Sequence, residues 1–406
     1  MVRVIQSDDL NPVPFGGWET NVATAFDDVF VTGNYFGAYS RDGGSSWVSV
    51  NPKGLQPEGL QPVNPGDVTY CDQRVLYIPQ INRFAWVILA MPHDGPITLA
   101  ISEPARLRDS NGRSWVRYNI WPSTVRQDDQ ELDYPDISFG DSYLYLTSNI
   151  GARGMIARLP LAELAQATTV NMQYYIVPQS WICPVQSSGA KGFFGAHTDS
   201  SKTRVWSWAE PKSAHMTSLE FPISTIRSED WVVDLPTEQW FVPDAHKVDN
   251  AIIGAARLRN ELWFAWMEAR RVAGNPNALV YPFPHINTAV VDATSLKLLR
   301  QERIWSSKAA YGWPILTAND RDVAMLCVYG GGQTNGGAEL VVGFLTSPRK
   351  LQLATSGNRG GSGWHYMGVR PAYFSTTAFA AVGYNRRLLP VSDKKSRPHY
   401  VVFERG

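Results

Sequence analysis

Polar side chains that could do chemistry follow directly on strongly apolar runs in this 406-residue sequence. The clearest case is Glu268, which comes straight after the apolar run 262–267 and is followed by Arg270 and Arg271. A carboxylate in that position is either a functional acid with its own ion-pair partner or the point where a strand leaves its sheet. The long segment 272–284 contains Pro and Gly, as substrate-covering loops often do, and this favours the first interpretation.

The composition indicates an all-β protein. Aromatic residues make up 12% of the chain, including 15 Trp, and charged residues only 18%, which suits closely packed sheets whose faces are mostly covered. The 33 Gly and 27 Pro are spread along the chain, as expected from many short turns. Lys plus Arg and Asp plus Glu balance at 37 each, so we expect neither nucleic acid nor an anionic membrane as a partner.

The cysteines and the N-terminus bear on whether the protein has a metal or redox site and on where in the cell it works. Cys71, Cys183 and Cys327 are far apart and lack Cys-x-x-Cys spacing, so we expect buried reduced thiols, no metal site and no cofactor. The first residues lack the apolar core of a secretory leader, and no apolar window is long enough to span a membrane. We therefore expect a cytoplasmic protein, or a secreted one if a leader has been removed.

A four-strand unit repeats along the chain, and its strongly apolar second strand is the easiest part to recognise. Seven such strands recur at a spacing of roughly 55–60 residues, with one longer gap, which predicts a β-propeller of seven blades, with six as the alternative. We expect residues 1–406 to form a single propeller domain. The seven apolar strands are 29–32, 84–89, 143–146, 192–195, 262–266, 323–328 and 378–382.

The last unit lacks a strand of its own. After the segments 366–369, 378–382 and 399–403 the chain ends without a fourth strand, whereas the segment 2–5 at the other terminus is a spare one. We predict that this N-terminal strand completes the last blade and closes the ring, because closure removes the exposed edges that an open sheet would leave.

The segment 40–47 reads Ser-Arg-Asp-Gly-Gly-Ser-Ser-Trp and resembles the Asp-box (BNR) repeat of the sialidase-like β-propellers. A weaker copy at 110–115 keeps the Gly-x-Ser-Trp end but has Ser110 where the repeat has aspartate. In this motif polar side chains hydrogen-bond the backbone of the turn and the tryptophan packs sideways, so its role is structural. The residues to which the resemblance gives that role are Ser40, Asp42, Gly44 and Trp47.

The resemblance also implies where a site would lie. In such propellers the starts of the innermost strands and the ends of the second strands converge on one central depression. The residues that this rule selects as catalytic candidates are Glu268, Tyr311, Asp67, Asp133, His197 and Tyr366. Those selected for substrate binding are Trp18, Glu19, Tyr35, Trp181, Arg270, Trp313, His365 and Arg370.

Cleavage of a glycosidic bond needs a carboxylic acid and a nucleophile or base on either side of it, and sialidases use a tyrosine nucleophile. Tyr311 or Tyr366 beside Glu268 or Glu19 fits such a pair, with Asp67 or Asp133 as the acid. True sialidase activity is disfavoured, because the region where those enzymes carry their first carboxylate-binding arginine holds no arginine here. It holds Glu19 instead, which would repel a carboxylate.

We favour an enzyme, of glycoside hydrolase or lyase type, that binds a small ring-bearing substrate or glycan and acts by acid-base chemistry. Two alternatives stay open. The tryptophans Trp18, Trp181, Trp313 and Trp364 could hold a hydrophobic natural product for cyclisation or dehydration. The protein could also be a non-catalytic lectin or interaction platform, although blades that have diverged this far favour one central site. The pattern predicts neither the substrate nor the oligomeric state.

Overall fold

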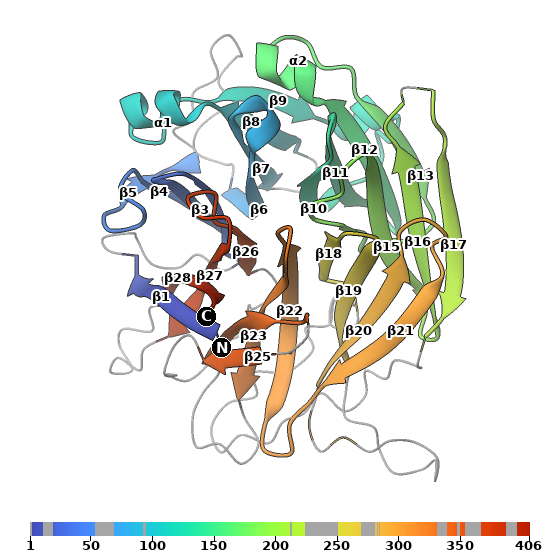
Figure 1. Cartoon of the computed structure of the whole chain (residues 1–406). Helices are drawn as coiled ribbons and strands as arrows, with labels where there is room; N and C mark the ends of the chain where they lie inside the picture. The colour runs from blue at the N-terminus through green and yellow to red at the C-terminus, as the bar shows by residue number, and fades with distance from the viewer. Residues whose placement is uncertain are drawn as a thin grey trace.

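The computed structural model forms a ring of seven four-stranded antiparallel sheets, which confirms the seven-bladed β-propeller (Figure 1). The strands of six blades follow one another along the chain, with the innermost strand first. In the seventh blade the sheet order is β1-β28-β27-β26, so the N-terminal strand closes the ring as predicted. The structure describes residues 2–10, 19–52, 69–91, 95–211, 213–223, 251–268, 281, 283, 285–330, 339–346, 350–353, 367–386 and 396–406.

The strand bounds are given blade by blade. Blade 1 contains β2 (Asn21–Ala25), β3 (Asp28–Gly33), β4 (Phe36–Ser40) and β5 (Val48–Val50). Blade 2 contains β6 (Thr69–Ile78), β7 (Arg83–Met91), β8 (Ile97–Ser102) and β9 (Val116–Ile120). Blade 3 contains β10 (Leu132–Phe139), β11 (Tyr143–Ile150), β12 (Arg153–Pro160) and β13 (Gln173–Val177). Blade 4 contains β14 (Cys183–Pro184), β15 (Lys191–Asp199), β16 (Lys202–Ala209) and β17 (Met216–Pro222).

Blade 5 contains β18 (Gly254–Leu258), β19 (Glu261–Glu268), β20 (His285–Asp292) and β21 (Leu298–Ile304). Blade 6 contains β22 (Ala310–Ala318), β23 (Val323–Gly330), β24 (Glu339–Phe344) and β25 (Lys350–Leu353). Blade 7 contains β26 (Gly368–Pro371), β27 (Ala378–Arg386), β28 (Ser396–Arg405) and β1 (Val2–Asp9). Short helices connect some strands: α1 (Pro104–Ser110), α2 (Leu161–Gln166), and the 3-10 turns η2 (Pro79–Ile81) and η3 (Pro122–Val125). No described helix is long and apolar enough to cross a membrane.

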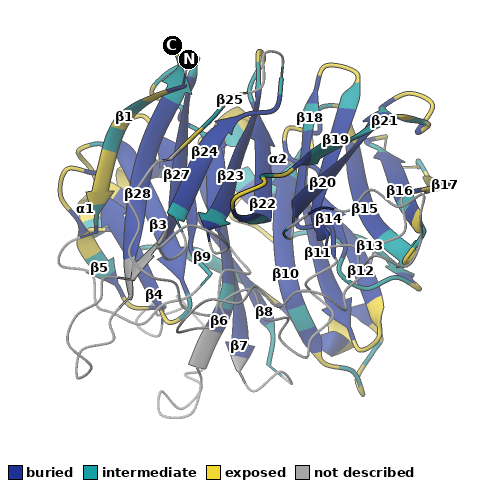
Figure 2. Ribbon diagram, turned by 90° about the horizontal axis from the view of Figure 1, so that it is seen from below, coloured by how far each residue is buried: buried dark blue, intermediate teal, exposed yellow. Residues whose placement is uncertain are grey.

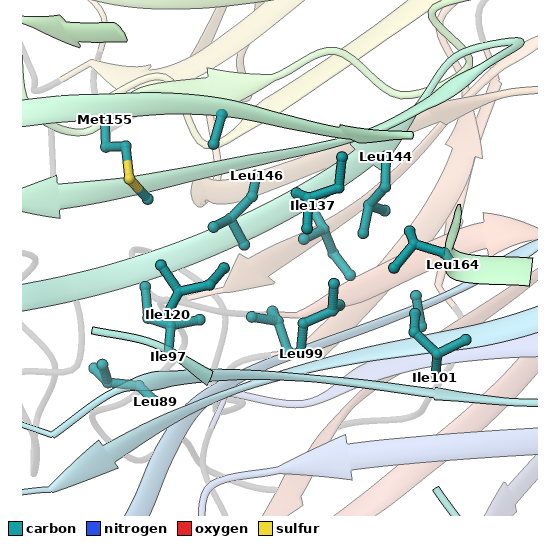
Figure 3. Close-up of a cluster of buried hydrophobic side chains, with 14 of the residues drawn as sticks. Leu89, Ile97, Leu99, Ile101, Ile120, Ile137, Leu144, Leu146, Met155 and Leu164 are labelled. Atoms are coloured by element: carbon teal, nitrogen blue, oxygen red, sulfur yellow. The ribbon is translucent and has the colours of Figure 1, made fainter. Parts of the chain in front are cut away.

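Apolar side chains fill the space between neighbouring blades. Every residue of β3 and of β11 is buried, because each sheet packs against another on both faces, and the strands are dark blue over most of Figure 2. Between blades 2 and 3, for example, Leu99 and Ile101 of β8 face Leu144 and Leu146 of β11 (Figure 3). The three cysteines are buried and free, as expected.

Three of the innermost strands carry a bulge near the end where they begin. Pairing with the second strand slips between Cys71 and Arg74 in β6, and the same irregularity occurs in β10 and β22. A residue with positive φ stands in each bulge: Asp72 (45°), Tyr134 (50°) and Trp313 (54°). A bulge turns its side chain away from the regular alternation of the pleat. The bulges therefore redirect polar and aromatic side chains at this end of the axis.

The innermost strands also approach each other closely. A Cβ atom added to Gly368 of β26 would lie 2.6 Å from the Cα atom of Asn21 in β2. One added to Gly254 of β18 would lie 2.5 Å from the carbonyl oxygen of Pro314 in β22. Only glycine allows these backbones to touch, so the packing at the axis leaves no room for a larger residue at these two positions.

Side chains hold the 40–47 turn in the way its motif predicts. Ser40 Oγ accepts a hydrogen bond from the Gly44 amide at 2.8 Å, and Asp42 Oδ1 accepts one from the Ser46 amide at 2.8 Å. Trp47 packs edge-on against Tyr400 of the last blade, with 5.6 Å between ring centres. In the second copy the Ser110 hydroxyl accepts the Ser114 amide at 2.9 Å, so a serine replaces the aspartate as acceptor.

We expect Asp42→Ala to lower the free energy of unfolding by about 1–2 kcal/mol, because the Ser46 amide loses its acceptor and the turn its cross-link. Urea unfolding followed by tryptophan fluorescence measures this. Arg41→Ala, an exposed change in the same turn, is the matched control. Equal stability of the two variants would contradict the structural role given to Asp42.

Candidate functional site

Three neighbouring blades bring carboxyl groups to the end of the axis where the innermost strands begin. Glu19 stands just before β2, Asp72 lies in the bulge of β6, and Asp133 lies near the start of β10. Asn34, at the end of the second strand of blade 1, connects the first two: its Nδ2 donates to Glu19 Oε2 at 2.8 Å and its Oδ1 accepts the Asp72 amide at 2.8 Å. We call these four residues the acidic cluster.

The carboxyls of the acidic cluster influence one another. Burial raises the pKa of Glu19 well above its usual value, and the negative charge of Asp72 raises it further, while Asn34 and Arg74 oppose the shift. The pKa of the Cys71 thiol is raised by burial and then by Asp72, Glu19 and Asp133, so these three carboxyls surround one point. A carboxyl that keeps its proton beside others that are ionised can act as a general acid.

Aromatic side chains border the acidic cluster. Tyr134, in the bulge of β10, and Trp181, just before β14, meet edge to face with 4.6 Å between ring centres. The Trp181 amide donates to Asn149 Oδ1 at 2.7 Å, which fixes the start of β14 against blade 3. Tyr35 follows Asn34 and is 57% exposed, with φ of 73°. Flat rings of this kind can stack on the apolar faces of sugars or of planar molecules.

A buried ion pair lies deeper along the axis. Arg74 Nε of β6 lies 3.4 Å from Asp136 Oδ1 of β10, and both side chains are almost fully buried. Arg370 of β26 is also buried, at 6% exposure, and the Asp136 charge acts on it too. Arg370 lines a narrow cavity with Thr24, Tyr77 and Thr317, towards the ends of the innermost strands. It therefore lies further from the acidic cluster than its predicted place at the start of a strand.

Glu268 lies in a second polar network, on the face of blade 5 that packs on blade 4. Its Oε2 accepts a hydrogen bond from Asn287 Nδ2 at 2.8 Å and lies 3.4 Å from His285 Nε2 and 3.7 Å from Arg303 Nε. Burial alone would raise the pKa of Glu268, but hydrogen bonding and positive charge from His285 and Arg303 lower it below the usual value. These contacts keep the Glu268 carboxylate ionised and provide it with hydrogen-bond and ion-pair partners, which indicates a structural role.

His197 belongs to the same inter-blade region. Its Nδ1 lies 2.8 Å from the Thr203 hydroxyl, and its ring meets the edge of Trp266 at 5.0 Å. Burial lowers the pKa of His197 to about 3, so the ring is neutral at physiological pH. A histidine held in this way fills space between blades 4 and 5 and shares a hydrogen bond with Thr203 of its own sheet.

Tyr311 and Trp313 pack against other parts of the ring. The Tyr311 ring lies 4.8 Å from that of Tyr329, in the apolar cluster between blades 5 and 6. Trp313 is buried, and its amide donates to the Met267 sulfur at 2.8 Å. Tyr311 and Glu268 therefore belong to different regions of packing, on opposite faces of blade 5.

The structure thus brings together four of the predicted residues: Glu19, Tyr35, Asp133 and Trp181. The predicted residues Asp67, Tyr366, Trp18, Arg270 and His365 lie outside the described residues. The prediction does not include Asp72, although a polar run at 72–74 inside an otherwise apolar strand is a signal for a bulge. Among the described residues no cluster of three or more metal-binding side chains occurs.

Comparisons with known proteins give structural similarity only. No protein family model matches the sequence, and no curated protein matches it. The chain superposes on the α-L-arabinofuranosidase Arb93A from Fusarium graminearum with a TM-score of 0.47 and 9% identity, covering 98% of this chain and 97% of that one. It superposes on the Penicillium chrysogenum α-L-arabinanase with a TM-score of 0.47 and 8% identity, covering 98% of each chain.

The subtype N10 neuraminidase-like protein of A/little yellow-shouldered bat/Guatemala/060/2010 gives a TM-score of 0.39 at 9% identity, covering 86% of this chain and 98% of that one. Such similarities concern the ring of sheets and do not indicate a shared reaction.

We expect Glu268→Gln to lower the free energy of unfolding by about 3 kcal/mol at neutral pH, because His285 and Arg303 lose their buried negative partner. Chemical denaturation measures the loss. Glu220→Gln is the control. Glu220 lies on the outermost strand β17, and the loss of its partly exposed ion pair with Arg204 should change the free energy of unfolding little. Wild-type stability in Glu268→Gln would contradict the network described here.

The raised pKa of Glu19 predicts the pH dependence of its contribution to stability. A carboxyl whose pKa is higher in the folded than in the unfolded protein adds to the free energy of unfolding at pH values below its unfolded pKa. This contribution is lost as the pH rises towards the folded pKa. Between pH 4 and pH 8 the wild type should therefore lose melting temperature relative to Glu19→Gln.

Asp292→Asn is the control with the opposite sign, because amide hydrogen bonds from Ser295 and Thr294 lower the pKa of Asp292. The wild type should gain stability relative to Asp292→Asn as pH rises from acid to neutral. Parallel melting curves for the wild type and Glu19→Gln over the same range would show that Glu19 has an ordinary pKa.

Proposed function

We propose that this protein is an enzyme that cleaves a glycosidic bond by acid-base catalysis at the acidic cluster. The observation that carries the proposal is the Glu19–Asn34–Asp72 arrangement. The Asn34 side chain binds the partly buried Glu19 carboxyl and the backbone amide of Asp72, whose own carboxyl lies beside that of Glu19. Glycoside cleavage needs one protonated and one ionised carboxyl group, and environments that separate the pKa values of two neighbouring carboxyls provide both.

Each residue has a role in this proposal. Glu19 keeps its proton and donates it to the leaving oxygen, because burial and the Asp72 charge oppose its ionisation. Asp133, from the next blade but one, supplies the carboxylate that acts on the sugar or on water. The partly buried Trp181 provides a flat ring on which a sugar can stack, the buried Tyr134 holds that ring from its edge, and the exposed Tyr35 forms the rim.

In this proposal the substrate group that binds at the acidic cluster is neutral or cationic. Three carboxyls surround Cys71, so a substrate carboxylate would be repelled here. This agrees with the expectation that sialic acids are not the substrate. Glu268 and His197 have structural partners, and in this proposal they support the packing of blades 4 and 5.

The first experiment is a panel of aryl glycosides and neutral oligosaccharides, with product analysis by mass spectrometry. Hydrolysis adds a water molecule to the products and elimination does not, so the same data separate the two reactions. We expect Glu19→Gln to lower kcat by at least about 100-fold with little change in KM, and Asp292→Asn to leave both unchanged.

Two results would contradict the proposal. If Glu19→Gln and Asp133→Asn both retain full activity on a substrate that the wild type cleaves, the chemistry lies elsewhere. If sugars bind without any product, the protein is a lectin. Turnover of a hydrophobic natural product with no action on glycosides would favour the cyclase or dehydratase alternative.

The pH profile tests the coupling between the two carboxyls. Asp72→Asn removes a neighbouring negative charge, so ionisation of Glu19 becomes easier and its pKa falls. The alkaline limb of kcat/KM should therefore move to lower pH in Asp72→Asn. An unmoved limb would mean that Glu19 is not the proton donor.

A further inference from the structure

A second depression lies at the opposite end of the axis, where the innermost strands end. It has a volume of about 750 Å³ and lies among the connections between first and second strands of six blades. The connection after β26 contributes Tyr373 and Phe374, and Phe374 is 40% exposed. This volume is within the range of small-molecule binding pockets.

A smaller cavity of about 10 Å³ lies next to this depression inside the ring. Phe139, Ser187, Pro371 and Tyr373 line both spaces, so the two adjoin at these residues. The volume accommodates one water-sized group. We call this smaller space, which adjoins the larger depression, the inner cavity.

Arg370 lines the inner cavity and has little to compensate its charge. Its Nη1 donates to the Val369 carbonyl at 3.3 Å, and its buried Nε has no hydrogen-bond partner within the described part of the chain. The nearby Asp136 carboxylate already pairs with Arg74 at 3.4 Å. A buried guanidinium with an unused donor is unfavourable unless an anion or a dipole meets it.

Among the described residues of the walls, no carboxylate makes a hydrogen bond with Arg370. Their charged residues are Arg257, Arg259, Asp141 and Asp320, which balance two against two, so Arg370 is left as the excess positive charge. Arg257 is already engaged with backbone carbonyls, as its Nε donates to the Arg259 oxygen at 2.8 Å. Although burial lowers the pKa of Arg370 to about 10, the side chain remains a cation at neutral pH.

The segment that carries Arg370 and Tyr373 is held in place by blade 1. The Thr24 hydroxyl accepts the Tyr373 amide at 2.9 Å and lies 3.4 Å from the Pro371 carbonyl oxygen. The Tyr373 ring meets Tyr77 edge-on at 5.2 Å. The guanidinium and the ring therefore have a fixed spacing before any ligand binds, which lowers the entropic cost of binding.

We propose that this depression is a second ligand site, separate from the acidic cluster, for a small ring-bearing carboxylate. One carboxylate oxygen enters the inner cavity and accepts from Arg370 Nε, and the ring lies against Tyr373 and Phe374. The proposal does not depend on the glycosidase proposal, because its residues lie at the other end of the axis.

Calorimetric titration of the full chain with sodium benzoate tests the proposal, and benzamide, of the same shape but neutral, is the matched ligand. We expect one benzoate per chain and at least about tenfold weaker binding of benzamide. Arg370→Met should weaken benzoate binding at least about tenfold, and Phe374→Ala, an exposed change, several-fold. Phe26→Ala, which alters an exposed Phe in the corresponding turn of blade 1, should bind as the wild type does.

The proposal is overturned if benzoate does not bind, or if benzamide binds equally well. It is also overturned if Phe374→Ala binds benzoate as tightly as Phe26→Ala does, and this comparison remains decisive if Arg370→Met fails to fold. Weaker benzoate binding in Glu19→Gln would place the ligand at the acidic cluster instead, and would equally contradict the proposal.

Discussion

The structure depends on the meeting of seven innermost strands around one narrow axis. Sheets that splay outward have ample room for Leu, Ile and Trp between their outer strands, but near the axis backbones come into contact. Gly368 against Asn21 and Gly254 against Pro314 are such contacts. Three of the innermost strands bulge near their starts, where Asp72, Tyr134 and Trp313 adopt positive φ. The apolar packing between blades offsets the free-energy cost of this crowding.

The same constraint explains why the two ends of the axis differ in chemistry. The bulges occur where the innermost strands begin, and they turn Asp72 and Tyr134 out of the pleat beside Glu19 and Trp181. The other end has regular strands and polar connections, with Arg370 lining the cavity beneath them. Between the ends, the Arg74–Asp136 pair occupies the interior of the ring. One scaffold thus has an acidic end and an end with an excess positive charge.

The ring itself could be predicted from the sequence, whereas the grouping of the site residues could be predicted only in part. Strands buried on both faces appear as continuous apolar runs, so β7, β19 and β23 are visible without an alignment. Closure by β1 followed from counting strands. Glu19, Asp133 and Trp181 were selected because they stand at the starts of innermost strands, and the structure brings them together.

The remaining assignments could not be made because neighbouring residues of one strand face different blades. Met267 packs towards blade 6, whereas its neighbour Glu268 packs towards blade 4. The sequence does not show which way each residue faces, so it did not show that Glu268 is separated from Tyr311 of blade 6. Asp72 was missed for a related reason, since a bulge adds one residue and shifts the alternation after it. Arg370 stands only two residues after the start of β26, yet it lines the deeper cavity.

We propose that Glu19 holds a proton beside Asp72 at the start of the innermost strands. Carbon-13 NMR of the side-chain carboxyls, with Glu19 assigned by its absence in Glu19→Gln, measures this directly. We expect the Glu19 carboxyl to titrate well above the usual range of glutamates. A Glu19 signal that titrates together with those of surface glutamates would contradict it.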